Sequence, residues 1–130
     1  MKRSILSIGR SKGMAYLLKT ITHNLYNLIA VNDVFSGIHL LKQKNEIELI
    51  IIDIDYQTKE SIDFILHIRS SKLYNQYQII LSSEQNHRII EPLIKGSRYN
   101  YFIKPFNPIQ LGSRINDLMI TKAISKVSKQ

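Results

Sequence analysis

The sequence predicts an α/β fold in which helices cover both faces of one parallel β-sheet. Five short apolar runs of strand length alternate with five segments whose apolar residues recur at helical spacing. The central run, Glu48–Asp53, has consecutive aliphatic residues before its final carboxylate, which is typical of a strand buried on both faces. Because crossovers between parallel strands are right-handed, this alternation leaves few other architectures.

The N-terminal half supplies two strands and two helices before the central run. Ser4–Ile8 reads as the first strand and is followed by a turn at Gly9–Gly13. Apolar residues at helical spacing then predict a helix that buries Met14, Leu17, Leu18, Ile21 and Leu25. Leu28–Val31 is the second strand. Asn32 or Asp33 can cap the next helix, whose buried face is expected to hold Val34, Ile38 and Leu41.

The C-terminal half repeats this alternation after Asp53. A polar loop at Asp55–Lys59 leads into a third helix that carries Ile62, Ile65 and Leu66. Gln78–Ser82 is the fourth strand. The fourth helix is expected to carry Asn86, Ile89, Ile90, Leu93 and Ile94, with Gly96 as its C-terminal cap. Tyr99–Ile103 is the fifth strand, and the last helix buries Leu111, Ile115, Leu118 and Met119.

Length and composition favour a single domain over residues 1–130, with a core of about residues 2–119 and a helical extension at 120–130. The absence of cysteine excludes a disulfide framework and thiolate metal sites. No apolar run approaches the roughly 20 residues of a membrane span, and the N-terminal apolar segment is too short and broken for a signal peptide. We therefore expect a cytoplasmic protein without a membrane segment.

The net charge of +8 raises the alternative of an anionic partner such as nucleic acid. The basic residues are spread along the chain, and neither a groove-reading helix nor a stacking motif is evident, so nucleic-acid binding ranks last among the functions considered. No P-loop pattern is present at Gly9–Gly13. The histidines lack metal-ligand spacing and are expected at the surface; they are His23, His39, His67 and His87.

Three chemically distinct side chains are predicted to meet at one edge of the sheet. Asp53, Ser82 and Lys104 follow or end the third, fourth and fifth strands. The carboxyl ends of parallel strands share one edge, where open α/β sheets bind their ligands. A carboxylate, a hydroxyl and an ammonium in one crevice can hold a phosphoryl group, with the acid as acceptor and the other two as contacts to phosphate oxygens.

Three segments carry a resemblance to the receiver domains of response regulators in bacterial two-component systems. They are Leu49–Asp53, Ile79–Ser83 and Tyr101–Phe106, and the resemblance extends from about Lys2 to Met119. It implies a flavodoxin-like fold of three layers, with a five-stranded parallel sheet in the order 2-1-3-4-5. It also implies a signalling function through a phosphorelay.

The resemblance assigns roles residue by residue. Asp53 matches the phosphoacceptor, Ser82 and Lys104 the residues that contact the phosphate, and Tyr101 the switch aromatic, while the Lys104–Pro105 bond is expected to be cis. Partners would be a histidine kinase and a protein bound by the fourth helix, fifth strand and fifth helix; a homodimer stays open. Two simpler interpretations remain, in which Ser82 bonds only to backbone and Tyr101 keeps its hydroxyl in water.

The pattern departs from the family after the first strand, where Gly9 and Arg10 replace two metal-binding acids. Magnesium needs carboxylate ligands, so we expect no metal or cofactor, unless Asp53 and Asp55 together hold Mg²⁺. Arg10 can take the place of the metal, and Asp53 is then a buried acid paired with Lys104 or with Arg10. Asp55 is the other possible partner of Arg10. Gln57 replaces a common proline.

These departures predict an atypical, degenerate receiver that acts by protein–protein interaction, with weak or no magnesium-dependent phosphorylation. It would not be an enzyme, beyond at most its own phosphorylation and dephosphorylation at Asp53. The alternative is a conventional receiver that a histidine kinase phosphorylates on Asp53.

Overall fold

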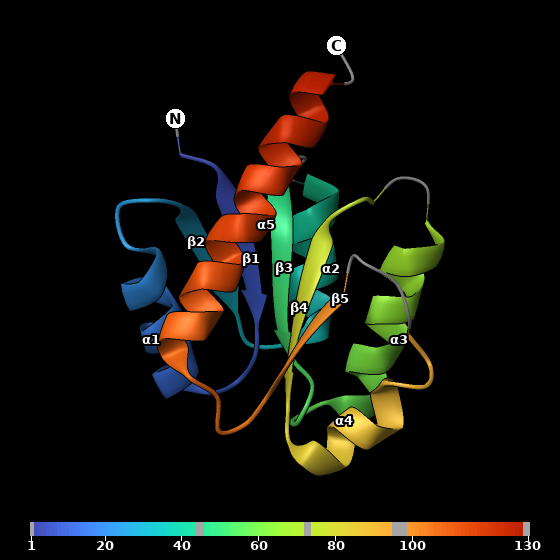
Figure 1. Ribbon diagram of the computed structural model, residues 1–130. Coiled ribbons are helices and arrows are strands. Elements are labelled where there is room, and N and C mark those ends of the chain that lie inside the picture. Colours follow the sequence, from blue (N-terminus) through green and yellow to red (C-terminus); the bar gives the residue numbers. More distant parts are fainter. Residues whose placement is uncertain (1, 44–45, 72–73, 95–98, 129–130) are drawn as a thin grey trace.

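The computed structural model describes residues 2–43, 46–71, 74–94 and 99–128, with side chains up to residue 124 (Figure 1). Strands and helices alternate along these residues. The strands are β1 (Ser4–Ile8), β2 (Asn27–Val31), β3 (Ile47–Asp53), β4 (Tyr77–Ser82) and β5 (Tyr99–Ile103). The helices are α1 (Lys12–Thr22), α2 (Val34–Gln43), α3 (Thr58–Ser70), α4 (Glu84–Ile90) and α5 (Pro108–Ser128).

The five strands form one sheet in the order β2-β1-β3-β4-β5, and every adjacent pair is parallel. The predicted fold class and strand order are therefore confirmed. Each predicted strand also ends at the residue expected for it. Because β3 lies between β1 and β4, it is the central strand of the sheet (Figure 1). Its last residue, Asp53, therefore lies at the middle of the end of the sheet where the parallel strands finish.

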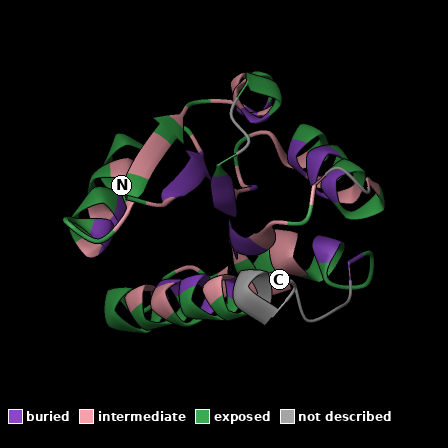
Figure 2. Cartoon of the chain, turned by 90° about the horizontal axis from the view of Figure 1, so that it is seen from above, coloured by how far each residue is buried: buried purple, intermediate pink, exposed green. Residues whose placement is uncertain are grey.

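Helices cover both faces of the sheet and bury a separate cluster on each. Figure 2 shows the buried residues gathered on the strands and on the inward sides of the helices. The α2, α3 and α4 side packs on one set of strand residues, which includes Leu6, Ile8, Ile50, Ile52 and Ile80. The α1 and α5 side packs on the alternate set, which includes Ile5, Leu49, Ile51, Ile79 and Leu81. This alternation follows from the period of two in a strand, and it gives the three expected layers.

The first helix differs from the prediction at both ends. It begins at Lys12, inside the predicted turn, because the Ser11 hydroxyl caps it by accepting a hydrogen bond from the Met14 N–H at 3.1 Å. It ends at Thr22, and Asn24 lies in the left-handed region with a φ of 66°, which stops the helix. Leu25, predicted to be buried, is therefore exposed.

The capping residue of α2 is Asp33, one of the two candidates. Its Oδ1 accepts a hydrogen bond from the Ser36 N–H at 2.7 Å. A second bond comes from a loop far along the chain, since the Gln57 Oε1 accepts from the Val34 N–H at 3.2 Å. Gln57 thus has a structural role at the start of α2. The sequence pattern, in which Gln57 only replaces a common proline, did not predict this role.

The fourth helix is shorter than predicted. It ends at Ile90, and a hydrogen-bonded turn then returns Ile94 to the core through its N–H bond to the Ile90 carbonyl at 3.2 Å. Ile90 and Ile94 are buried, whereas Ile89 and Leu93 are exposed. The apolar spacing therefore continues past the end of the helix. Gly96, the predicted cap, lies outside the described residues.

The last helix buries all four residues predicted for it, Leu111, Ile115, Leu118 and Met119. It continues without interruption through the expected extension to Ser128. Within the described part of the chain, no helix is both long and apolar enough to cross a membrane.

Candidate functional site

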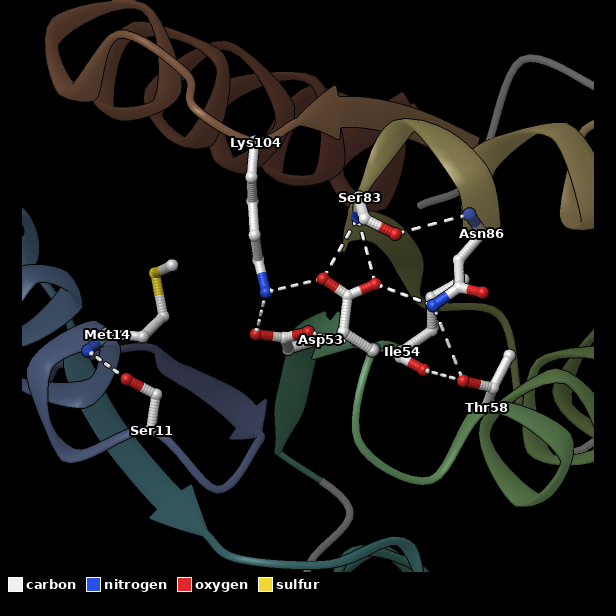
Figure 3. A network of polar contacts seen from close by, with 9 residues as sticks. Ser11, Met14, Asp53, Ile54, Thr58, Ser83, Asn86 and Lys104 are labelled. Atoms are coloured by element: carbon white, nitrogen blue, oxygen red, sulfur yellow. Dashed lines mark hydrogen bonds and ion pairs between the residues drawn. The ribbon is translucent and has the colours of Figure 1, made fainter.

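Lys104 bridges two carboxylates at the loop-bearing edge of the sheet. Its Nζ lies 2.6 Å from Asp53 Oδ2 and 2.9 Å from Asp55 Oδ2. Figure 3 shows the Lys104 side chain reaching from the end of β5 toward Asp53 at the end of β3. The Asp53 side chain is only 9% exposed and that of Lys104 is 30% exposed. The predicted meeting of the acid and the ammonium is confirmed, and it leaves the Asp53 charge neutralised.

The backbone around Lys104 sets this geometry. Its N–H donates to the Ser82 carbonyl at 2.8 Å, one residue beyond the end of β5, so the chain stays beside β4. The Lys104–Pro105 peptide bond is cis, as predicted. Burial alone would lower the pKa of Lys104, but its hydrogen bonds to Asp53 and Asp55 outweigh burial and raise the pKa. The side chain therefore remains a cation.

Asp53 is held on its other side by backbone. The Asp55 N–H donates to Asp53 Oδ1 at 3.0 Å, so both carboxylate oxygens are engaged. Gly9 lies directly against this side chain, because a Cβ built there would come within 3.2 Å of the Asp53 Cβ. The first of the two replaced acidic positions is thus packed against the acid itself.

Asp55 has more partners than the sequence suggested. Both of its oxygens accept from the Ser83 N–H at 2.9 Å, and Oδ1 also accepts from Asn86 Nδ2 at 2.8 Å. Burial raises the pKa of Asp55, but the bonds from Ser83, Lys104 and Asn86 lower it more, so the net pKa is below its ordinary value. Asp55 thus stays ionised and joins the end of β3 to the start of α4.

Ser83 and Asn86 belong to this network, and the sequence interpretation gave neither of them a role in the site. Ser83 also caps α4, because its hydroxyl accepts from the Asn86 N–H at 3.2 Å (Figure 3). A serine directly before a helix is an ordinary capping signal and could have marked the position. No sequence signal indicates that its backbone N–H faces Asp55.

Ser82 ends β4 beside this network and is fully buried. Within the described residues its Oγ has no hydrogen-bond partner. The interpretation of Ser82 as a hydroxyl bonded only to backbone is therefore wrong. A buried hydroxyl without a partner costs free energy, and the Ser82 hydroxyl is left as a donor at the C-terminal end of β4.

Arg10 does not form the predicted ion pair. Its guanidinium stacks 4.0 Å from the centre of the Tyr56 ring, and among the described residues no ion pair joins it to Asp53 or Asp55. Both acids are paired with Lys104 instead. Tyr56 is largely exposed, so Arg10 gains a cation–π contact there without the desolvation that a buried pair requires.

The lining of the cavity beside Asp53 determines which ligands a magnesium ion would meet there. A cavity of about 60 Å³ opens between the start of α1 and β3, lined in part by Gly9, Arg10, Ser11 and Asp53. Asp53 is the sole carboxylate in its lining, and Asp55 is engaged elsewhere. Mg²⁺ takes hard oxygen ligands, mainly carboxylates. Within the described ranges, no group of three or more acidic or histidine side chains could hold a metal.

Tyr101 is half-buried, and its hydroxyl makes a hydrogen bond within the protein. The hydroxyl donates to the Ile94 carbonyl at 2.7 Å, just after α4. The Tyr101 and His87 rings form a T-shaped contact with centroids 5.0 Å apart. Burial raises the pKa of Tyr101. The hydroxyl thus has a partner in the protein, and the residue connects β5 to the segment just after α4.

His87 was predicted to lie at the surface, but it is mostly buried. Its side chain is 16% exposed, and its Nε2 lies 3.0 Å from Glu91 Oε2. The other histidines, His23, His39 and His67, are exposed as expected.

The face made by α4, β5 and α5 combines an edge strand, a groove and exposed apolar side chains. β5 is an edge strand, so one side of its backbone lacks a neighbouring strand of the described sheet. A groove of about 880 Å³ runs along β5 and the first turns of α5. Large apolar side chains are exposed on or beside these elements, at Ile89, Leu93, Ile103 and Ile109.

Comparison with known proteins shows the fold. No protein-family model matches the chain, and neither does any curated protein. Solved structures do match. One is a response regulator receiver modulated diguanylate cyclase from Pelobacter carbinolicus, 25% identical with a TM-score of 0.74, covering 95% of this chain and 97% of that one.

Two further structures agree. A signal receiver domain of a two-component signal transduction histidine kinase from Clostridium thermocellum is 23% identical, with a TM-score of 0.75 and 91% and 98% of the two chains covered. The signal receiver domain of an HD domain-containing protein from Pseudomonas fluorescens Pf-5 is 17% identical, with a TM-score of 0.79 and 95% and 98% covered. The chain therefore has the fold of response regulator receiver domains.

Proposed function

We propose that this chain is a receiver-like signalling module that acts by binding a protein partner, with little or no magnesium-dependent phosphorylation of Asp53. One observation carries the proposal. Lys104 already holds Asp53 at 2.6 Å, while Gly9 and Arg10 stand where a receiver needs two acids. Structural neighbours described as response regulators and signal receiver domains support the signalling role.

The chemistry of phosphoryl transfer is the reason for the second part of the proposal. Transfer places negative charge on the phosphoryl oxygens beside an anionic acceptor, and bound metal ions offset that charge. In this pocket Lys104 is the sole cation bonded to Asp53 within the described residues, and Arg10 is turned to Tyr56. A phosphoryl group would have to be stabilised by Lys104 and by the free hydroxyl of Ser82.

The partner would bind the face formed by α4, β5 and α5. Exposed apolar residues near a groove favour protein contact, because such a groove can take side chains from a partner. Tyr101 lines this groove, and its hydroxyl bonds to the Ile94 carbonyl, four positions after the end of α4. The face is therefore connected to the segment that follows α4. A histidine kinase is one partner of this class, and a second copy of the chain is another.

A conventional phosphoacceptor is the second candidate. It is favoured by the positions of Asp53, Ser82 and Lys104, which match a receiver site at the same strand ends. It requires that Mg²⁺ bind with fewer carboxylates than usual.

Labelling with a small phosphodonor separates the two candidates. The full chain is incubated with phosphoramidate, with Mg²⁺ or with EDTA, and its mass is measured intact. We expect no magnesium-dependent gain of a phosphoryl group. A gain that requires Mg²⁺ and disappears in Asp53→Asn would establish the conventional receiver instead.

A further inference from the structure

The carboxylate of Asp55 sits among donors that come from different parts of the chain. The Ser83 N–H and the Asn86 side chain approach it from the start of α4 at 2.9 and 2.8 Å. The Lys104 ammonium approaches it from the end of β5 at 2.9 Å. A backbone amide, a carboxamide and an ammonium around one carboxylate are the donors that an oxyanion such as phosphate requires.

One of these donors, Lys104, is also the donor available to a phosphoryl group on Asp53. Lys104 is bonded to Asp53 and Asp55 alike, so it is shared between them. Ser82 matches the residue whose hydroxyl contacts the phosphate in receivers, and Ser83 directly follows it. The Ser83 N–H already donates to both Asp55 oxygens. An oxyanion that enters this crevice meets occupied donors and a second negative charge.

We infer that Asp55 is an internal ligand of this pocket, which fills its oxyanion-binding donors and holds α4 against the end of β3 without a phosphoryl group. The inference rests on the proposed function, because it explains how a receiver-like module can keep one state without phosphorylation. It assigns to Asp55 a role distinct from the metal binding considered for it above.

A chain of contacts leads from Asp55 to the face formed by α4, β5 and α5. Asn86, which donates to Asp55, precedes His87, and the His87 and Tyr101 rings form a T-shaped contact with centroids 5.0 Å apart. The Tyr101 hydroxyl in turn bonds to the Ile94 carbonyl. Release of Asp55 would therefore loosen the start of α4, which carries the contact to Tyr101.

Removal of the carboxylate should expose the site to an external anion. The ¹⁵N-labelled full chain is titrated with inorganic phosphate at constant ionic strength, in EDTA, while the Ser83 N–H and the Asn86 side-chain amide are followed by NMR. In Asp55→Ala we expect both signals to move from their wild-type positions and then to respond saturably to phosphate. Phosphate should bind this variant at least about tenfold more tightly than it binds the wild type.

Two variants complete the design. Asp55→Asn keeps the shape of the side chain and loses its charge, so it covers the case in which Asp55→Ala does not fold, and it should also gain affinity for phosphate. Asp63→Ala removes an exposed carboxylate of α3 and should behave as the wild type.

The inference is overturned if the wild type binds phosphate at Ser83 as tightly as the Asp55 variants, or if neither variant shows a saturable response. It is equally overturned if the Ser83 signal is unchanged when Asp55 is replaced. Because Mg²⁺ is absent, these results do not depend on Asp53 phosphorylation. Conversely, magnesium-dependent labelling of Asp53 would refute the phosphorylation-independent function and leave the Asp55 contact in place.

Discussion

Lys104 Nζ lies 2.6 Å from Asp53 Oδ2 and holds a carboxylate that is only 9% exposed. Replacing Lys104 with methionine should leave two anions without their cation. Removing one partner of a fully buried pair costs roughly 3–5 kcal/mol, and since Lys104 is partly exposed we expect a loss of about 2 kcal/mol in unfolding free energy. Urea denaturation measures this loss.

Two controls isolate the ion pair. Lys59→Met replaces an exposed lysine of α3 and should change stability by less than about 0.5 kcal/mol. In an Asp53→Asn background the Lys104→Met substitution should cost about 1 kcal/mol less than in the wild type, because one of the two anions is gone. Equal costs in both backgrounds would show that Lys104 does not contribute through its pairing with the charge of Asp53.

The dependence of stability on pH should report Asp55. Burial raises the pKa of Asp55, but the hydrogen bonds from Ser83, Lys104 and Asn86 lower it by more, so the pKa lies below its ordinary value of 3.8. The folded state therefore holds this proton less readily than the unfolded chain. Asp55 contributes stability above its unfolded pKa of about 3.8, and that stability is lost as the pH falls through the folded-state value. The stability difference between wild type and Asp55→Asn should shrink on acidification below about pH 4. A constant difference would contradict the ionic role.

Tyr101→Phe should test the link between β5 and the end of α4. The substitution removes the hydrogen bond to the Ile94 carbonyl and keeps the ring against His87. We expect a loss of about 1 kcal/mol, the usual net contribution of one hydrogen bond, and faster amide exchange around Ile94. Tyr16→Phe, at an exposed tyrosine of α1, is the matched control and should leave both measurements unchanged.

Gln57→Ala should weaken the start of α2. It removes the carbonyl oxygen that accepts from the Val34 N–H, and loss of a capping acceptor costs about 1 kcal/mol. Hydrogen exchange of the Val34 amide should accelerate most. Gln85→Ala, at an exposed glutamine of α4, should have no such effect. If Val34 exchanges at the wild-type rate, Asp33 alone is sufficient to cap the helix.

The strands and the meeting of Asp53 with Lys104 could be predicted because both follow from local pattern and topology. An apolar run such as Leu49–Ile52 has few alternatives to a central strand, and parallel strands must end at one edge. The cis bond before Pro105 was also predicted correctly, by resemblance.

The other contacts of the site depend on how the loops fold and where the helices end. The spacing of residues in the sequence does not determine these features. Arg10 contacts Tyr56, which lies in the loop after β3, and that contact exists only once both loops are folded. The partners of Asp55 depend on where α4 begins, and the bond made by Tyr101 depends on where α4 ends. Apolar periodicity placed that end too late, because Ile94 returns to the core through a turn rather than through the helix.

Arg10→Asp should create a magnesium site if missing carboxylates are what keep the pocket free of metal. Arg10 lines the cavity beside Asp53, and aspartate there would add a ligand and remove a cation. Unit charges about 4 Å apart interact by about 1 kcal/mol even in bulk water, and a divalent ion doubles this. We therefore expect Mg²⁺ affinity to rise by more than about tenfold, as measured by calorimetry.

Arg10 is the better position for this gain because a Cβ added at Gly9 would come within 3.2 Å of the Asp53 Cβ, so that one of the two would have to shift. Arg10→Ala is the control, since it removes the cation without adding a ligand and should bind Mg²⁺ more weakly than Arg10→Asp. If a metal is what the pocket lacks, the Asp variant should also acquire phosphoramidate labelling at Asp53, and a further Asp55→Asn substitution should increase it. Tight magnesium binding by the wild type would remove the premise.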